Sequence, residues 1–191
     1  MSSKIGVQNI AHTNGNVAAT ITSDGTLYAT NQIIQIVHVG NNTAFSSNNN
    51  NTWREYLSAS ITPKSSNSKI LIQHTVSYGG NSNSYGAGKL ARIISGASEV
   101  PLNYGSPHFT DSRFTDSSFP MQTVSSGQYK IYNTNFNFKD TPNTTSSITY
   151  KCYVKEASDG TDVVVNRSYT NPGSGYNPAS GSTIILTEIG G

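Results

Sequence analysis

Apolar and polar residues alternate over short segments along most of the chain, which is the spacing of half-buried β-strands. Two segments, residues 69–78 and 148–154, show the alternation most clearly. The faces expected to be buried are Ile70, Ile72, His74, Val76 and Tyr78 in the first and Ile148, Tyr150, Cys152 and Val154 in the second. No long segment has the 3.6-residue spacing of an amphipathic helix, so strands are the predicted elements.

Further strand-like segments follow closely, separated by Gly, Asn, Asp and Pro residues that favour turns. They cover residues 17–22, 32–39, 56–63, 89–94, 121–124, 129–138, 162–168 and 182–190. Residues 32–39 are almost continuously apolar, which predicts a strand covered on both faces. Residues 79–88 predict a flexible loop, and residues 99–128 predict long loops around one short strand. A reversal is expected at residues 140–143, with the Ser and Thr residues that follow bonding to nearby backbone groups.

About eight strands with turn signals between them predict an all-β fold, an antiparallel β-sandwich or jelly roll with an extended N-terminal arm. Residues 31–191 are assigned to the sandwich. Residues 1–30 are too short to bury a core, so this arm is expected to lie on its own globular domain or on a neighbouring chain. The apolar residues expected to anchor it are Ile5, Val7, Ile10, Val17, Ile21 and Leu27.

The composition agrees with a strand-rich chain of one domain. Of 191 residues, 34% are hydrophobic and 12% charged, and Ser, Thr and Asn together supply more than a third. Typical domains carry roughly 25% charged residues. The net charge is +2 without a basic cluster, which predicts no binding to nucleic acid. The apolar stretches are too short to cross a bilayer, and the first residues lack the apolar core of a signal peptide, so synthesis in a cytoplasm is expected.

Residues that carry chemistry are scattered along the chain. The four histidines, His12, His38, His74 and His108, show no ligand spacing, so no metal site and no cofactor are expected. The single cysteine, Cys152, alternates with strand residues and is expected to be a buried structural thiol. A glycoside hydrolase would need two carboxylates facing each other, among Asp111, Asp116, Asp140, Glu156, Asp159 and Asp162. Most of these lie in turns, where Asp is a turn former, so the chain is not expected to be an enzyme.

Several motifs carry a resemblance to a known family. The segment "IAHTNGNVAATITSDGTLYA" resembles the opening of small bacteriophage virion proteins, especially fibre proteins of marine and cyanobacterial phages. The segments "ITPKSSNSKILI", "DTPNTTSSITYK" and "STIILTEI" are similar to the β-rich domain at the C-terminal end of phage tail-fibre proteins. The resemblance implies a homotrimeric virion surface protein, assembled in the host cytoplasm. The chain lacks the extended repetitive shaft of long fibres.

Three functions follow as hypotheses. The first is a tail-fibre or receptor-binding protein that is attached to other virion proteins through residues 1–30 and contacts host-surface polysaccharide. Its expected contact residues are loop aromatics: Tyr85, Tyr104, Tyr176 and Trp53. The second is a capsid decoration or cement protein, or a head fibre, that stabilises the shell without a ligand. The third is a free lectin or a polysaccharide-degrading enzyme.

Overall fold

The computed structural model describes residues 7–11, 13–15, 17–21, 23, 25, 27–29, 31–47, 52–81, 84–103, 114–122, 127–156, 163–170 and 179–191. These residues form strands and short 3-10 turns such as η2 (Gly127–Tyr129), with no α-helix among them. The strands are β1 (Asn9–Ala11), β2 (Val17–Ile21), β3 (Leu27–Tyr28), β4 (Ile33–Asn41), β5 (Phe45–Ser46), β6 (Arg54–Ile61), β7 (Lys69–Gly80), β8 (Tyr85–Ile94), β9 (Val100–Leu102), β10 (Phe119–Gln122), β11 (Tyr132–Asp140), β12 (Ile148–Glu156), β13 (Val163–Val165) and β14 (Ser182–Ile189). The predicted all-β class is confirmed.

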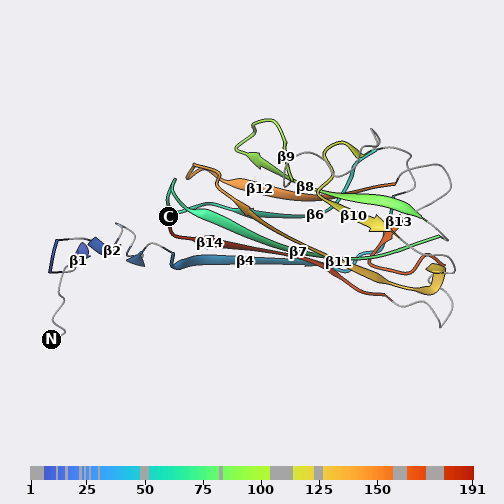
Figure 1. Cartoon of the computed structure of the whole chain (residues 1–191), viewed down its shortest axis with the longest axis horizontal. Coiled ribbons are helices and arrows are strands. Elements are labelled where there is room, and N and C mark those ends of the chain that lie inside the picture. Colours follow the sequence, from blue (N-terminus) through green and yellow to red (C-terminus); the bar gives the residue numbers. More distant parts are fainter. Residues whose placement is uncertain are drawn as a thin grey trace.

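Two antiparallel sheets face each other as a sandwich (Figure 1). One sheet has the order β4-β14-β7-β11, with β13 and β5 continuing beside β7 at one end. The other has the order β6-β12-β8, and both β9 and β10 pair with the remaining edge of β8. Numbered from β4, with the short strands β5 and β13 left out and β9 and β10 sharing one position, the orders are 1-8-3-6 and 2-7-4-5. This is the arrangement of a jelly roll, in which two Greek keys are wound together.

The core lies between the two sheets and is lined by the faces that alternation predicts. Ile70, Ile72 and Val76 of β7 are fully buried, and so is every second residue of β12 from Ile148 to Val154. Val37 and Val39 of β4 pack against the same cluster. Cys152 is buried and free, as expected, and burial raises the pKa of its thiol.

His74 is a core residue. Its side chain is buried, and Nε2 shares a hydrogen bond of 2.9 Å with the Tyr56 hydroxyl. Burial lowers the pKa of His74 from 6.5 to about 3, so the ring is neutral at physiological pH. His74 therefore packs in the core and holds the Tyr56 hydroxyl in place through its hydrogen bond.

The segment expected to be a flexible loop, residues 79–88, is mostly strand, so that prediction is wrong. Gly79 and Gly80 end β7, and β8 begins at Tyr85. A Cβ on Gly79 would lie 2.7 Å from the Arg167 carbonyl, and one on Gly88 would lie 1.9 Å from the Phe119 ring. These glycines therefore mark close approach to neighbouring atoms, which is a common reason for glycine inside a strand.

Two further expectations need correction. Strand β4 was expected to be covered on both faces, but it is an edge strand paired only with β14. Its residues Ile33 and Ile36 are 57% and 61% exposed. Residues 99–128 contain β9 as well as β10, both paired with β8, where mainly loops were expected.

The reversal at residues 140–143 is confirmed, and it includes a buried polar network. Strand β11 ends at Asp140, and the Ser146 amide donates to the Thr144 hydroxyl at 3.0 Å. Asp140 is more than a turn former, because its carboxylate accepts from the Arg92 guanidinium and, at 2.8 Å, from the Tyr150 hydroxyl. Burial raises the pKa of Tyr150, and the negative charge of Asp140 raises it further.

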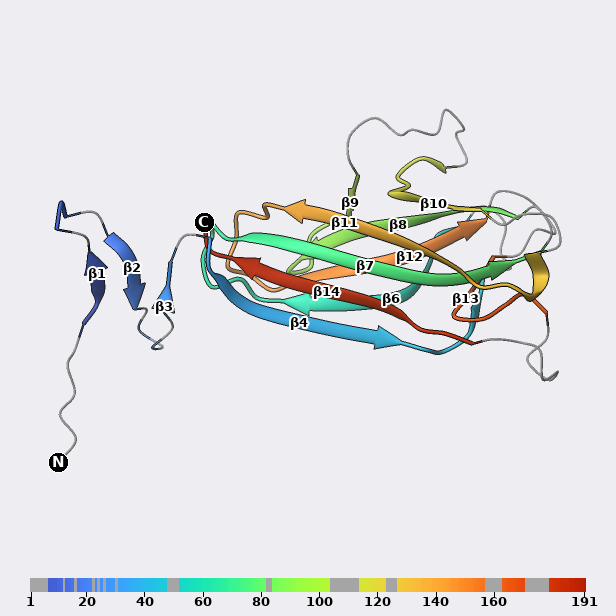
Figure 2. The same ribbon diagram turned by 60° about the horizontal axis from the view of Figure 1, so that its bottom comes forward.

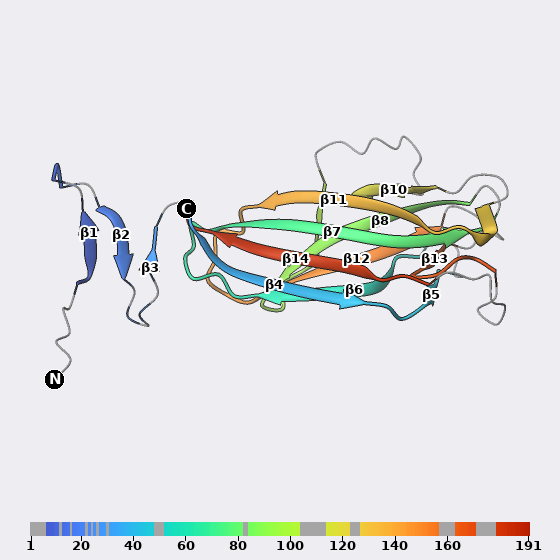
Figure 3. The ribbon, with the colours of Figure 1, turned by 90° about the horizontal axis from the view of Figure 1, so that it is seen from below.

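The N-terminal strands form a separate three-stranded sheet in the order β1-β2-β3. All three views place it beyond one end of the sandwich, the end at which the C-terminus lies (Figures 2 and 3). The chain enters the sandwich beside its last residues, since the Asn31 amide donates to the Gly190 carbonyl at 2.7 Å. The Gly190 amide in turn donates to the Gln32 carbonyl at 2.8 Å.

Candidate functional site

An aromatic cluster covers the outer face of the sheet β6-β12-β8. Trp53, which directly precedes β6, packs against the buried residues Ala87 and Phe114. The ammonium groups of Lys89 and Lys155 lie 5.3 and 5.4 Å from the centre of the Trp53 ring. These distances are within the range of cation–π attraction. Trp53 is therefore a partly buried ring held against the sheet by two lysines.

An ion pair extends this cluster along the same face. Lys89 Nζ lies 2.6 Å from Glu99 Oε1 and 4.4 Å from the centre of the Tyr153 ring, and the Tyr153 hydroxyl also donates to Glu99. Burial raises the pKa of Glu99. The hydrogen bonds from Lys89 and Tyr153, with the charges of Lys89 and Lys151, outweigh it and hold the pKa below 4.5. Glu99 is therefore ionised at neutral pH and neutralises Lys89.

Tyr85 is on the same outer face. It pairs with Gln122 at the first position of β8, and strand alternation puts it on the side of Ala87 and Lys89. Its side chain is 51% exposed. Of the four expected contact residues, Tyr85 and Trp53 thus belong to one sheet face, while Tyr104 and Tyr176 lie outside the described residues. A role of any of them in receptor binding stays a prediction.

The sequence carries a signal for this outer face. In residues 148–156 the buried positions alternate with Lys151, Tyr153 and Lys155, so the outward face of that strand could be read from the same pattern. The partners Lys89 and Glu99 could not be found in this way. They come from β8 and from the segment before β9, which pair as a hairpin, but β8 meets Tyr153 only through the long-range pairing of β8 with β12.

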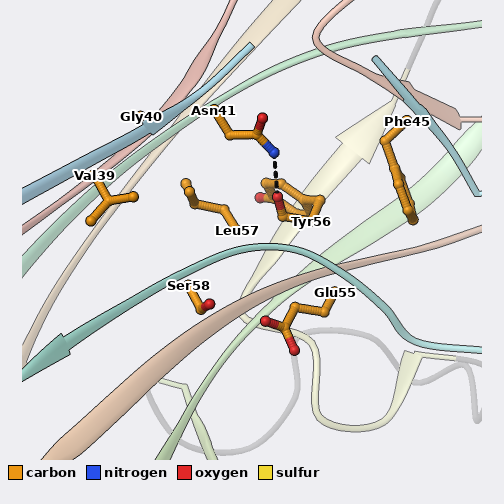
Figure 4. Close-up of a pocket in the computed structure, with 8 residues that line it drawn as sticks. All are labelled: Val39, Gly40, Asn41, Phe45, Glu55, Tyr56, Leu57 and Ser58. Atoms are coloured by element: carbon orange, nitrogen blue, oxygen red, sulfur yellow. Dashed lines mark hydrogen bonds between the residues drawn. The ribbon is translucent and has the colours of Figure 1, made fainter. Parts of the chain in front are cut away.

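A pocket of about 400 Å³ opens where the edge strands β4 and β6 of the two sheets meet (Figure 4). Its lining residues are Val39, Gly40, Asn41, Phe45, Glu55, Tyr56, Leu57 and Ser58. The Asn41 amide donates to the Tyr56 carbonyl at 2.7 Å, and Glu55 is paired with Lys151 at 2.8 Å. At one side the Arg54 guanidinium lies 4.6 Å above the Phe45 ring. The Phe45 ring, the Asn41 amide, the Glu55 carboxylate and the Ser58 hydroxyl therefore line one depression at this edge of the sandwich.

The apolar residues of the arm gather on one face of the small sheet. The register pairs Ile10 with Ala19 and Ile21 with Leu27, and alternation along β2 puts Ala19 and Ile21 on the same side. Ile10 and Leu27 are 49% and 42% exposed. Val7 and Val17 are exposed as well, and Ile5 lies outside the described residues. Most of the predicted anchoring residues therefore form an apolar surface.

Acidic, histidine and cysteine side chains do not converge in the part of the chain that the structure describes. No group of three of them there could hold a metal ion. His38 is exposed on β4 and His74 is buried, while His12 and His108 lie outside the described residues. Within the same described ranges, no helix is long and apolar enough to cross a membrane.

Comparison with known proteins gives only distant structural similarity. No protein-family model and no curated protein matches the chain. Two solved structures of infectious bursal disease virus, from the Gx and Gt strains, share 10% and 9% sequence identity with it, each with a TM-score of 0.43. The similarity covers 96% and 92% of this chain but 44% and 47% of those chains. The chain therefore spans less than half the length of the proteins it matches.

Proposed function

We propose that the chain is a bacteriophage virion structural protein, a homotrimeric tail-fibre or receptor-binding protein attached through residues 1–30. The observation that carries the proposal is that the two parts of the chain differ in how their apolar residues are buried. The jelly roll encloses its own core, whereas the small sheet beyond one end of it leaves its apolar face exposed. Such a face has to be buried against another surface to be stable. A segment of this kind suits attachment to a larger assembly.

The outer face of the sheet β6-β12-β8 is the proposed contact for host-surface glycan. Aromatic rings provide flat apolar surfaces for sugar rings, and exposed Tyr85 and the neighbouring cluster around Trp53 supply such rings. The low charge of the chain, with 12% charged residues, suits a neutral ligand recognised by hydrogen bonds. The pocket between β4 and β6, lined in part by Phe45, Asn41 and Ser58, is a second place proposed for such a ligand.

A capsid decoration or cement protein is the second candidate. It is favoured by the exposed Ile33 and Ile36 on β4, which give the sandwich an apolar surface in addition to that of the arm. With two such surfaces, the chain could join neighbouring shell subunits without any ligand.

Two measurements test these functions. Quantitative mass spectrometry of purified phage particles should find the chain, with tens of copies or fewer for a fibre and hundreds for a decoration protein. Purified protein should block phage adsorption if it binds the receptor, and Tyr85→Ser should weaken the block while Tyr129→Ser, at a tyrosine of similar exposure, should not. Absence from the particle would reject both candidates, and adsorption unaffected by the protein would reject the receptor-binding role.

A further inference from the structure

The arm and the start of the sandwich expose most of the large apolar side chains seen on the surface. Among the described residues, the exposed large hydrophobic side chains are Val7, Ile10, Val17, Leu27, Ile33, Ile36, Tyr85, Val100 and Tyr129. All but three of these precede residue 37. Apolar side chains exposed on a shared face, as Ile10 and Leu27 are on the small sheet, mark an interaction site.

The sandwich of the same chain does not cover the apolar face of the small sheet. The sheet lies past the end of the sandwich in all three views (Figures 1, 2 and 3). Ile10 and Leu27, which share that face, keep nearly half of their surfaces exposed. A sheet that is apolar on one face has to bury that face against another element to be stable. The missing layer must therefore come from another molecule.

The charge of the arm favours further copies of the same chain as that molecule. The described residues between 7 and 37 contain no Lys, Arg, Asp or Glu. In residues 1–30 as a whole, only Lys4 and Asp24 carry charged side chains, and their charges are opposite. Identical arms can therefore meet without the like-charge repulsion that disfavours self-association. The same property gives the arm no charged groups with which to select a different, charged partner.

We propose that the apolar face formed by Ile10, Ala19, Ile21 and Leu27 packs against the same face of other copies of this chain. Each copy supplies one three-stranded sheet, and the sheets enclose a shared apolar core around a symmetry axis. Closed symmetric assemblies of this kind are the usual form of homo-oligomers. The proposal rests on the proposed function and deepens it: the other copies occupy this face of each arm, and the trimer of arms then attaches to other virion proteins through surfaces other than this face.

The test is the mass of the purified full-length chain by analytical ultracentrifugation. The wild-type chain should sediment as a trimer. Ile10→Asp/Leu27→Asp should sediment as a monomer, because the two carboxylates would be buried in the shared core. Asn9→Asp/Ala18→Asp is the matched control: it adds the same charge to the opposite face of the sheet, at positions that do not pair directly, and should remain a trimer. A monomeric wild type, or a double Ile10/Leu27 variant with wild-type mass, would overturn the proposal.

A second measurement covers the case in which the double variant does not fold. Leu27→Cys in the otherwise native chain should form a disulfide between copies on mild oxidation, whereas Thr20→Cys should not. The native Cys152 is buried and will not interfere. Equal cross-linking at the two positions, or none at Leu27, would contradict the proposed contact. These experiments use purified protein, so a chain found absent from phage particles would reject the virion role and leave this inference standing.

Discussion

The sandwich and the N-terminal sheet are built from the same kind of strand but differ in how their apolar residues are buried. In the sandwich, β7 and β12 direct alternate side chains into a core that the opposite sheet closes. In the N-terminal sheet, β1–β3 also alternate, but Ile10 and Leu27 remain exposed. The alternation pattern therefore produces a sheet in both regions, while stability depends on whether a second layer is present.

This difference means that the two regions should respond to substitution in different ways. Changes inside the sandwich should lower its free energy of unfolding because its core is complete. Changes on the face of the small sheet should alter association and leave the unfolding of the sandwich nearly unchanged.

The largest effect is expected at Asp140. Replacing it by Ala removes the acceptor of the Tyr150 hydroxyl and leaves the mostly buried Arg92 charge unpaired. Losing one partner of a buried ion pair costs about 3 kcal/mol when the other partner keeps some contact with water, as Arg92 does at 22% exposure. Urea denaturation should show the loss. Glu55→Gln breaks a more exposed pair with Lys151 and should cost under about 1 kcal/mol. Equal losses would mean that the Asp140 network is not specially stabilising.

A smaller loss is expected from Gly88→Ala. The added Cβ would lie 1.9 Å from the Phe119 ring, so β10 or its ring must move. Overpacking of this kind costs about 1–3 kcal/mol. The matched control is Gly40→Ala, where the nearest atom would lie 3.8 Å away and little change is expected. Thermal unfolding of both variants, followed by circular dichroism, measures the difference, and a Gly88→Ala variant as stable as wild type would contradict the close contact.

Acidification should weaken the sandwich through His74. Its pKa is about 3 in the folded chain and 6.5 when unfolded, so the unfolded chain binds more protons between these values. Stability should therefore fall as the pH decreases from 6.5, by at most about 1.4 kcal/mol per pH unit.

Urea midpoints at pH 7, 6 and 5 test this dependence while most carboxylates remain ionised. His74→Gln removes the titrating group and keeps a polar side chain beside Tyr56. Its midpoint should change less over this range than that of the wild type. Parallel profiles for the two chains would show that His74 is not the source of the pH dependence.

The smallest effect on unfolding is expected at Ile10. Ile10→Ala removes apolar surface that is about half exposed in the single chain. The free energy of unfolding of the sandwich, measured with urea, should therefore change by no more than about 0.5 kcal/mol. Val76→Ala, at a fully buried valine, should cost distinctly more. A large loss from Ile10→Ala would mean that the small sheet and the sandwich unfold as one unit.

The sequence predicted correctly those strand faces and turns that depend on local alternation of apolar and polar residues. The buried faces of β7 and β12 and the turn after Asp140 follow from spacing along one strand. Predictions failed where burial depends on a distant segment. The glycines of residues 79–88 predict a loop in the sequence, but in the structure they allow close contact with Phe119 and Arg167. The apolar run in β4 predicts a strand covered on both faces, but its position at the edge of the sheet could not be read from the sequence. The meeting of Lys89 with Tyr153 likewise depends on the long-range register of β8 and β12.

The place of β14 in its sheet also constrains how the chain can fold during synthesis. It lies between β4 and β7 and bonds to both, so β4, made early, has no sheet partner until the last strand is available. Contacts between such distant segments form slowly because a long loop must close first. A ribosome-bound chain would therefore hold an open, incomplete jelly roll until Ser182–Ile189 emerges, and the insertion of β14 would be the closing step of folding.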